Sequence, residues 1–344
     1  MTAQAAAHLD TEHLGPYLAV QVPRFGQLVS AEKFAGGQSN PTFLITSTEG
    51  RFVLRRKPPG ALLKSAHAVD REYRIMAALA QTDVPVPRVL HLCEDEAVIG
   101  SMFYVMDYVE GRIFWDGKLP DLKPEERTAI YDSMNGALAA LHSVDPAAVG
   151  LADYGKPGSY FERQIGRWTG QYRASETHPV PAMDELIAWL DGNTPEDDGR
   201  VSLVHGDYRL DNMIFEPAGT RILAVLDWEL STLGHPLADL AYQCMQWRLP
   251  SEGVFRGLGG IDRKAHGIPT EAEYVERYCR RTGFEVVGHW PFYLAFSFFR
   301  LAAILQGVYK RSLDGNASNP ERARLMGEAV PMMAGMALEV VGGR

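Results

Sequence analysis

The chain of 344 residues carries 34 lysines and arginines against 43 aspartates and glutamates, which gives a net charge of −9 at pH 7. Because nucleic-acid backbones bind basic surfaces, this charge disfavours a nucleic-acid partner. Hydrophobic residues make up 46% of the chain and charged residues 22%, close to the averages of globular proteins, so a disordered chain is excluded.

Three features bear on where the protein works. The cysteines are odd in number and far apart: Cys93, Cys244 and Cys279. This spacing predicts neither a disulfide framework nor a cysteine-based zinc site, and a reducing cytoplasm is the simplest setting. Residues 1–10 lack the basic and apolar regions of a signal peptide. The most apolar stretch, residues 292–308, is interrupted by Arg300 and Gln306, so we expect a buried helix and no membrane partner.

The first third of the chain has the pattern of several strands and one helix. Alternating apolar residues, glycine turns and one stretch with helical spacing define these elements. In chain order we predict a strand over 36–46, a turn at 48–50, a strand over 51–55, a helix over 66–80, and strands over 88–94 and 101–108. Such a composition is typical of a small α+β domain.

The rest of the chain is predicted to be mostly helical. The predicted helices cover residues 125–142, 159–173, 182–190, 271–282 and 291–311. Between them, residues 201–228 are rich in β-branched side chains, which indicates a short β insert. We place the boundary between the two domains at 108/109, so that the domains comprise residues 1–108 and 109–344.

The strongest functional signal is the octet His-Gly-Asp-Tyr-Arg-Leu-Asp-Asn at residues 205–212. Two short strands separated by a turn lead from it to Asp227. If these strands form an antiparallel hairpin, Asp227 lies beside Asn212, because paired strands are about 5 Å apart. Phosphoryl transfer from ATP needs a carboxylate that accepts the proton of the attacking hydroxyl and oxygen ligands that hold Mg²⁺. Asp207 suits the first role, and Asn212 with Asp227 the second; taken singly, Asp207 or Asn212 could equally cap a turn.

This segment resembles the catalytic and metal-binding loops of the aminoglycoside phosphotransferase family, which has a protein-kinase-like fold. Asp207 and Asn212 keep the spacing of the kinase loop H-R-D-x-x-x-x-N, and Asp227-Trp228-Glu229 stands where kinases have D-F-G. Asp239 matches the aspartate that braces the catalytic loop in these enzymes, with a helix N-cap as the alternative. Arg209 takes the place of a lysine that contacts the transferred phosphate in many protein kinases, and a solvated loop arginine is the alternative.

The resemblance extends over most of the chain and implies an α+β fold of two lobes. Residues 1–108 would be a small nucleotide-binding lobe with an antiparallel sheet and one helix. Residues 109–344 would be a larger, mostly helical lobe that carries the catalytic loop and the substrate site.

The resemblance also implies which residues bind the phosphates of ATP. Residues 34–42 resemble the loop that covers the phosphates, although a Gly-Gly pair alone is typical of a hairpin turn. The expected contacts come from Gly36, Gly37, Ser39 and Asn40. The family's phosphate-binding lysine falls at Arg55, and Lys57 lies on the same face of the strand, so either cation could reach the nucleotide. Glu72 is the expected ion-pair partner on the next helix, with a surface charge as the alternative.

Residues 102–111 resemble the hinge that holds the adenine ring. Backbone groups of Asp107, Tyr108 and Val109 would make the hydrogen bonds, and Met106 is the residue just inside them. Because the backbone reads the base, these side chains do not distinguish ATP from GTP.

The residues that recognise the phosphate acceptor are less sharply defined by the sequence. Candidates are Glu229, Arg163, Arg167, Trp168 and Arg300. A solvated helix surface is the simpler interpretation of the two arginines at 163 and 167. Arg300 lies within an apolar helix, so it needs a partner, either a core carboxylate or an anionic substrate.

The chain also resembles the kinase-like domains that are fused to acyl-CoA dehydrogenases in animals. We therefore expect an ATP- and Mg²⁺-dependent kinase that phosphorylates a hydroxyl of a small molecule, such as a hydroxyacyl-CoA or another anionic metabolite. Two alternatives stay open: an aminoglycoside phosphotransferase, and a nucleotide-binding regulatory module without catalysis.

Overall fold

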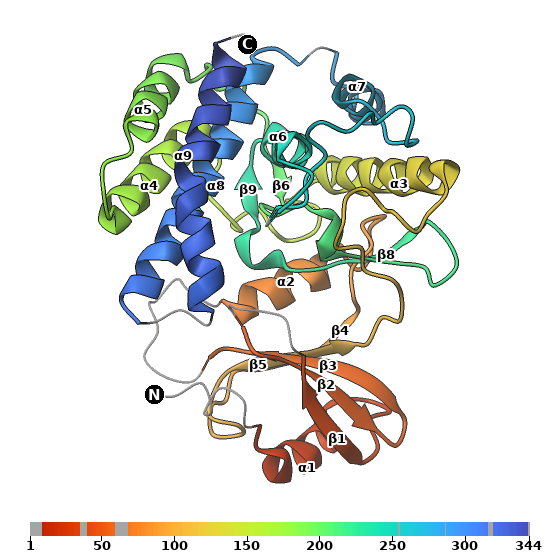
Figure 1. Ribbon diagram of the computed structural model, residues 1–344. Helices are drawn as coiled ribbons and strands as arrows, with labels where there is room; N and C mark the ends of the chain where they lie inside the picture. The colour runs from red at the N-terminus through yellow and green to blue at the C-terminus, as the bar shows by residue number, and fades with distance from the viewer. Residues whose placement is uncertain are drawn as a thin grey trace. The chain divides into compact units, whose positions relative to one another are not determined.

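The structure is a computed structural model that describes residues 9–34, 40–58, 68–253, 255–285, 287–315 and 319–342 (Figure 1). The chain divides into two compact units. Residues 1–113 and 212–231 form the N-terminal unit, and residues 114–211 and 232–344 form the C-terminal unit. This division differs from the predicted boundary at 108/109 in one important respect, because residues 212–231 group with the N-terminal unit.

The N-terminal unit is built on an antiparallel sheet with the strand order β1-β2-β3-β5-β4 (Figure 1). Its strands are β1 (Leu28–Lys33), β2 (Thr42–Ser47), β3 (Gly50–Arg56), β4 (Val89–Cys93) and β5 (Phe103–Asp107). Four of these correspond to predicted strands, whereas β1 was not predicted. The expectation of a small antiparallel sheet is therefore confirmed.

Two helices pack on this sheet, α1 (Thr11–Gln21) and α2 (Val69–Leu79). Leu18 of α1 packs in an apolar cluster with Phe52 and Leu54 of β3. Because strand side chains alternate between the two faces, Arg55 points to the opposite face, where it meets Glu72 of α2. The sheet therefore has one apolar face and one face that carries charged groups.

The hairpin of β7 (Met213–Phe215) and β8 (Ile222–Val225) was predicted and is confirmed. Its attachment to the N-terminal unit is made by backbone hydrogen bonds. Arg112 and Phe215 exchange two of these bonds, each 2.9 Å long, and the Val225 N–H donates to the Pro85 carbonyl at 2.8 Å. Backbone pairing of this kind has no side-chain signature, which is why the sequence did not indicate it.

The C-terminal unit is mostly helical, as predicted. Its helices are α3 (Pro124–Ser143), α4 (Tyr160–Ser175), α5 (Pro181–Asn193), α6 (Leu237–Arg248), α7 (Glu271–Thr282), α8 (Trp290–Leu313) and α9 (Pro320–Val341). A short sheet pairs β6 (Ser202–Val204) with β9 (Thr232–Gly234). The helices α6 and α9 were not predicted. Because α6 is buried on nearly all sides, it lacks the one-sided apolar pattern that identifies a surface helix.

Within the described residues, α8 is the helix whose length and composition would allow it to cross a membrane, but most of it is buried. It packs against α4, α5, α6 and α9 (Figure 1). Both Arg300 and Gln306 are buried in it. The predicted buried helix is therefore confirmed.

Candidate active site

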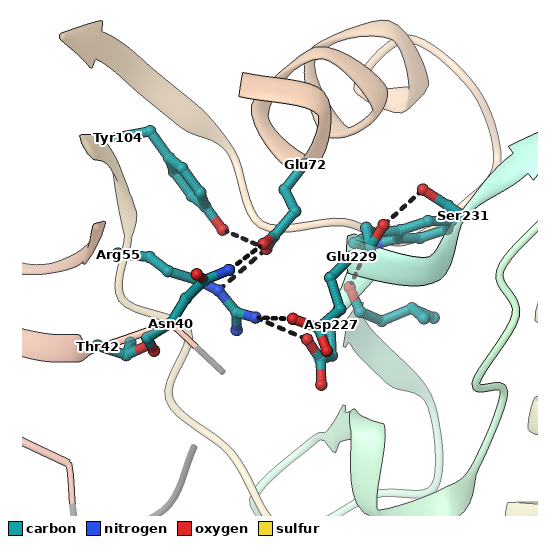
Figure 2. A network of polar contacts seen from close by, with 10 residues as sticks. Asn40, Thr42, Arg55, Glu72, Tyr104, Asp227, Glu229 and Ser231 are labelled. Atoms are coloured by element: carbon teal, nitrogen blue, oxygen red, sulfur yellow. Dashed lines mark hydrogen bonds and ion pairs between the residues drawn. The ribbon is translucent and has the colours of Figure 1, made fainter. Parts of the chain in front are cut away.

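In the N-terminal unit, the Arg55 side chain contacts three carboxylates, a set called here the Arg55 network (Figure 2). Its Nε lies 3.0 Å from Oε2 of Glu72. Its Nη2 lies 2.8 Å from Oδ1 of Asp227 and 3.5 Å from Oε2 of Glu229. Residues from β3, from α2 and from the segment after β8 are thereby brought together by one guanidinium.

Lys57 lies beyond β3 on the same face of the strand but makes a different contact. Its Nζ is 3.7 Å from Oδ1 of Asp70, and both side chains are partly exposed. Of the two cations that the sequence offered, Arg55 is the one that pairs with Glu72.

Glu72 is buried and receives hydrogen bonds from two further side chains (Figure 2). Nδ2 of Asn40 donates to Oε1 at 2.9 Å, and the Tyr104 hydroxyl donates to Oε2 at 3.1 Å. In the β3–β5 register Tyr104 lies opposite Arg55, so both reach the same carboxylate. The sequence did not point to Tyr104. The predicted contact of Asn40 with phosphate stays a prediction. The predicted Gly36, Gly37 and Ser39 lie outside the described residues.

The Arg55 network holds more negative than positive charge. Burial raises the pKa of Glu72 to about 7, because repulsion by Asp227 and Glu229 adds to desolvation while Arg55 opposes it. Burial also works against the charge of Arg55, but attraction to the carboxylates outweighs it and raises the pKa of the guanidinium. The network therefore favours the approach of a further cation.

Asp227 has a left-handed backbone conformation, with φ at 65° and ψ at 62°. Residues other than glycine seldom adopt this conformation, and they cluster at functional sites when they do. On the other strand of the hairpin, the Asn212 carbonyl accepts a hydrogen bond of 2.8 Å from the Leu226 N–H. The hairpin thus places Asn212 and Asp227 at the same end, as predicted.

These two residues are the expected metal ligands. Within the described part of the chain, no three His, Cys, Asp or Glu side chains are grouped so that they could hold a metal ion. Mg²⁺ usually takes one or two protein oxygens and completes its shell with water and substrate phosphates. The oxygens of Asn212 and Asp227, beside a network with excess negative charge, fit that requirement.

The predicted adenine hinge follows β5. The N–H groups of Asp107 and Tyr108 donate to carbonyls within the N-terminal unit at 2.9 and 3.3 Å. Among the described residues, the Val109 N–H has no hydrogen-bond partner. Met106, just before them, is buried. Among the N–H groups of the three predicted hinge residues, that of Val109 is thus open to a ligand.

In the C-terminal unit, Asp207 accepts a hydrogen bond from a residue that the sequence did not reveal. The Tyr242 hydroxyl donates to Oδ1 of Asp207 at 2.8 Å. Arg209 also lies beside this oxygen, with its Nε at 3.2 Å, while its Nη2 is 3.0 Å from Oδ2 of Asp211. Tyr242 lies three residues after Asp239 on α6, so a prediction of α6 would have placed both on one helix face.

Asp239 braces the catalytic loop from the first turn of α6. Its completely buried carboxylate accepts the N–H groups of His205 at 2.6 Å and Gly206 at 2.8 Å, and it lies 3.3 Å from Nε2 of His142. Burial opposes its charge, but these hydrogen bonds prevail and keep the pKa of Asp239 below its usual value. Gly206 has a φ of 85°, a conformation that favours glycine. The alternative of an N-cap is wrong, because Pro236 occupies that position.

The predicted acceptor residues on α4 and α8 divide into surface and core. Arg163 donates to backbone carbonyls at 156 and 157, and Arg167 is exposed beside the Trp168 ring, as expected for a solvated helix. Arg300 is buried and donates from Nη2 to the Gly206 carbonyl at 2.5 Å. The expected carboxylate or substrate partner of Arg300 is therefore replaced by a backbone carbonyl.

Two of the cavities lined by described residues lie in the C-terminal unit. A small one of about 80 Å³ is lined by Arg209, Arg256 and several aromatic side chains, among them Trp115 and Trp247. A larger one of about 450 Å³ is lined by carboxylates and aromatic rings. Its acidic lining residues are Glu162, Asp191, Glu196, Asp197 and Asp198. Of these two, the small cavity is the one that includes residues of the octet at 205–212, so the larger one is not the place where chemistry on Asp207 is expected.

Comparisons with known proteins identify the family of this chain. The family model described as "Phosphotransferase enzyme family" matches residues 30–293. Mouse acyl-CoA dehydrogenase family member 10 is 53% identical over 89% of this chain and 28% of its own length. Rat acyl-CoA dehydrogenase family member 11 is 45% identical over 91% of this chain and 41% of its own length. The chain thus spans less than half the length of these relatives.

Solved structures show the same fold. A Ralstonia eutropha protein named as a candidate aminoglycoside phosphotransferase has a TM-score of 0.89 and 52% identity, over 98% of this chain and 99% of its own. The aminoglycoside phosphotransferase APH(4)-Ia, solved with ADP and hygromycin B, has a TM-score of 0.58 and 17% identity over 93% of this chain and 98% of its own, which is a likeness of fold. The resemblance found in the octet is confirmed, and the chain belongs to the phosphotransferase enzyme family, with the kinase-like fold of the aminoglycoside phosphotransferases.

Proposed function

We propose that the protein is a small-molecule kinase that uses ATP and Mg²⁺ and transfers the γ-phosphate to a hydroxyl of an anionic metabolite. The observation that carries this proposal is the Arg55 network, in which one guanidinium joins Glu72 of α2 to Asp227. In kinases, a cation paired to a glutamate binds phosphate and an aspartate after the hairpin binds the metal. The presence of ADP in APH(4)-Ia supports the nucleotide part.

The site residues of the N-terminal unit each have a defined role in this proposal. Glu72 orients Arg55, whose guanidinium binds the phosphates through its paired N–H groups. Asn212 and Asp227 hold Mg²⁺, and the Val109 N–H binds the base. When bound, Mg²⁺ neutralises phosphate charge and orients the transferred group.

Asp207 is the proposed general base. As the bond from the acceptor oxygen to phosphorus forms and the bond from phosphorus to the ADP oxygen breaks, the hydroxyl proton passes to the Asp207 carboxylate. The chain itself supports this assignment, because Asp207 precedes Asn212 by five residues and their Cα atoms are at most roughly 18 Å apart. Only four residues thus separate the base from a proposed metal ligand along the chain.

The small cavity beside the catalytic loop supports an anionic acceptor. Its charged lining residues are Arg209, Arg256 and Asp211; Asp211 is paired with Arg209, so Arg256 supplies the net positive charge, and aromatic rings give the cavity apolar walls. Its volume of about 80 Å³ accommodates one group of an acceptor and not a whole metabolite. A hydroxyacyl-CoA combines a hydroxyl, an apolar chain and anionic phosphates, and the names of the curated relatives favour this class.

An aminoglycoside acceptor is the second candidate. The cavity of about 450 Å³ has an acidic lining that would attract a polycation. Residues 205–212 are not among its lining residues, so a bound polycation there would not be placed at the base by this unit alone. This ranks the aminoglycoside below the anionic metabolite.

The decisive experiment is an ADP-release assay with MgATP and a panel of acceptors. The panel comprises hydroxyacyl-CoA esters, their free hydroxy acids, hygromycin B and spectinomycin, with GTP as a second donor. We expect turnover with an anionic acceptor and a loss of about a hundredfold or more in Asp207→Asn. Asp121→Asn, a change at an exposed loop residue, is the matched control.

Two results would contradict the proposal. Unchanged turnover in Asp207→Asn would refute the assignment of the base. A thermal shift with MgATP that is lost with EDTA, together with no ADP release for any acceptor, would favour the non-catalytic nucleotide-binding module.

A further inference from the structure

The side chain of Asp207 and the backbone beside it are held by one face of α6. Asp239 accepts the N–H groups of His205 and Gly206, and three residues further along the helix Tyr242 donates to Oδ1 of Asp207. Residues three apart project from the same side of a helix. One rigid element therefore holds the catalytic loop at two points, first by its backbone and then by its carboxylate.

Arg300 of α8 supports both of these points. It donates to the carbonyl of Gly206, the residue before Asp207, at 2.5 Å. Its guanidinium also lies over the ring of Tyr242 at 5.5 Å and over the ring of Trp168 at 5.6 Å. The part of the chain that the structure describes gives Arg300 no ion pair with a carboxylate. A buried cation without a carboxylate is costly, so its contacts with a carbonyl and two rings are its compensation.

The arrangement favours a fixed hydrogen bond from Tyr242 to Asp207. Burial and the nearby Asp207 charge raise the pKa of Tyr242, while Arg209 and Arg300 oppose the rise, so the phenol keeps its proton and remains a donor. The cation over the ring withdraws electron density from the phenol, which strengthens that donation. Donation to a charged acceptor is directional, so it selects one orientation of the carboxylate.

We infer that Tyr242, itself held by Arg300, is a positioning residue that fixes the Asp207 carboxylate for proton transfer. The inference rests on the proposed function, since it requires Asp207 to act as the base. Tyr242 does not touch the reacting atoms, and its effect is expected in the rate of the chemical step. The nucleotide ligands proposed above belong to the N-terminal unit, so the binding of MgATP should not depend on Tyr242.

The test uses Tyr242→Phe in the full chain, with MgATP as the donor and water as the acceptor. In this reaction the water oxygen bonds to phosphorus, the bond to ADP breaks, and Asp207 takes the proton. We expect kcat for ADP release to fall about tenfold, which corresponds to about 1.4 kcal/mol, while KM for ATP stays within twofold. Tyr17→Phe is the matched control, because it removes a tyrosine hydroxyl that lies 2.9 Å from Nε2 of His91 in the N-terminal unit.

Arg300 is tested by a double-mutant cycle. Arg300→Lys keeps the charge, whereas Arg300→Met removes it at similar length. If Arg300 acts through Tyr242, the activity of the double variant Tyr242→Phe/Arg300→Met is only slightly lower than that of the less active of the two single variants. If Arg300→Met does not fold, the same cycle with Arg300→Gln, which also removes the charge but keeps a polar group, gives the answer.

The outcomes separate this inference from the function on which it rests. A parent protein whose melting temperature rises with MgATP but that releases no ADP, either with water or with any acceptor of the panel, overturns the proposed kinase and the role of Tyr242 with it. A parent that releases ADP at the same kcat as Tyr242→Phe overturns the positioning role alone. Equal tenfold changes in kcat and in KM for ATP would also overturn it, because they indicate a general disturbance of the fold.

Discussion

The Arg55 network and the catalytic loop are held by opposite physical means. In the network, three carboxylates share one guanidinium, and Asp227 and Glu229 are partly exposed. Around the loop, the buried carboxylate of Asp239 is satisfied by backbone N–H groups and a histidine. The first region has a net negative charge that favours a further cation. In the second region, the carboxylate of Asp239 has its hydrogen bonds satisfied within the fold.

This difference indicates how the two regions would divide the work of the proposed phosphoryl transfer. A network with excess negative charge is stabilised by a cation that arrives with the nucleotide. A loop whose carboxylate brace is fully buried keeps its base in one place before any ligand arrives, which is the preorganisation that catalysis needs. Substitutions that break the brace of the loop should therefore act on folding, and substitutions in the network should act on both folding and nucleotide binding.

The largest effect is expected from Asp239→Asn, which breaks the brace. The neutral amide keeps the size of the side chain but loses the charge that accepts two backbone N–H groups. Hydrogen bonds to charged groups contribute roughly 1.5–3 kcal/mol each, so we expect a loss of about 5 kcal/mol in the free energy of unfolding. Urea unfolding measures it, with Asp145→Asn at an exposed turn as the control. A loss below about 1 kcal/mol would show that the loop does not need the brace.

Arg55→Met is expected to lower the free energy of unfolding by about 4 kcal/mol, less than Asp239→Asn, because the buried Glu72 then lacks its cation. The same variant should lose the thermal shift with MgATP. Arg55→Lys, which can keep one of the ion pairs, should recover part of both properties. If Arg55→Met binds MgATP as tightly as the parent protein, the phosphate-binding role belongs to another residue.

The free energy of unfolding should change by about 3 kcal/mol with pH because of Glu72. The pKa of Glu72 rises from the usual 4.5 to about 7 in the folded protein. Between these pH values the folded state binds more protons than the unfolded state. The free energy of unfolding should therefore fall as pH rises from 4.5 through 7, an effect that Glu72→Gln removes. Thermal melts of the ligand-free protein from pH 5 to 8 measure it, with Glu125→Gln as the exposed control. A parent and a Glu72→Gln variant with equal pH slopes would contradict it.

The sequence predicted those parts of the site that depend on short spacing. The octet and the hairpin lie within a few residues of each other, so strand geometry was enough to place Asn212 and Asp227 together. Strand alternation also placed Arg55 and Lys57 on one face, although it left open which of them pairs with Glu72. That choice depends on the position of α2 against the sheet, which is a tertiary property.

The missed contacts join distant segments through groups without a sequence signal. Arg300 binds a backbone carbonyl, which every residue has. Tyr242 lies on α6, a helix buried on nearly all sides, so no one-sided pattern marked it. Asn40 is buried against Glu72, 32 residues away, and nothing in a glycine-rich stretch foretells that partner.

The smallest effect is expected from Lys57→Met. This variant tests whether MgATP binding depends on Arg55 alone or also on Lys57, which lies outside the Arg55 network. Lys57 is paired with Asp70 in a partly exposed ion pair, and such pairs contribute less than about 1 kcal/mol because water screens them. We expect the free energy of unfolding to change by no more than that, and the MgATP affinity by no more than about fivefold, which corresponds to the same free energy. Isothermal titration with MgATP on Lys57→Met and on Arg55→Met, side by side, makes the measurement. Equal losses of affinity in the two variants would mean that both cations bind the phosphates, and that the pairing with Glu72 does not mark the nucleotide ligand.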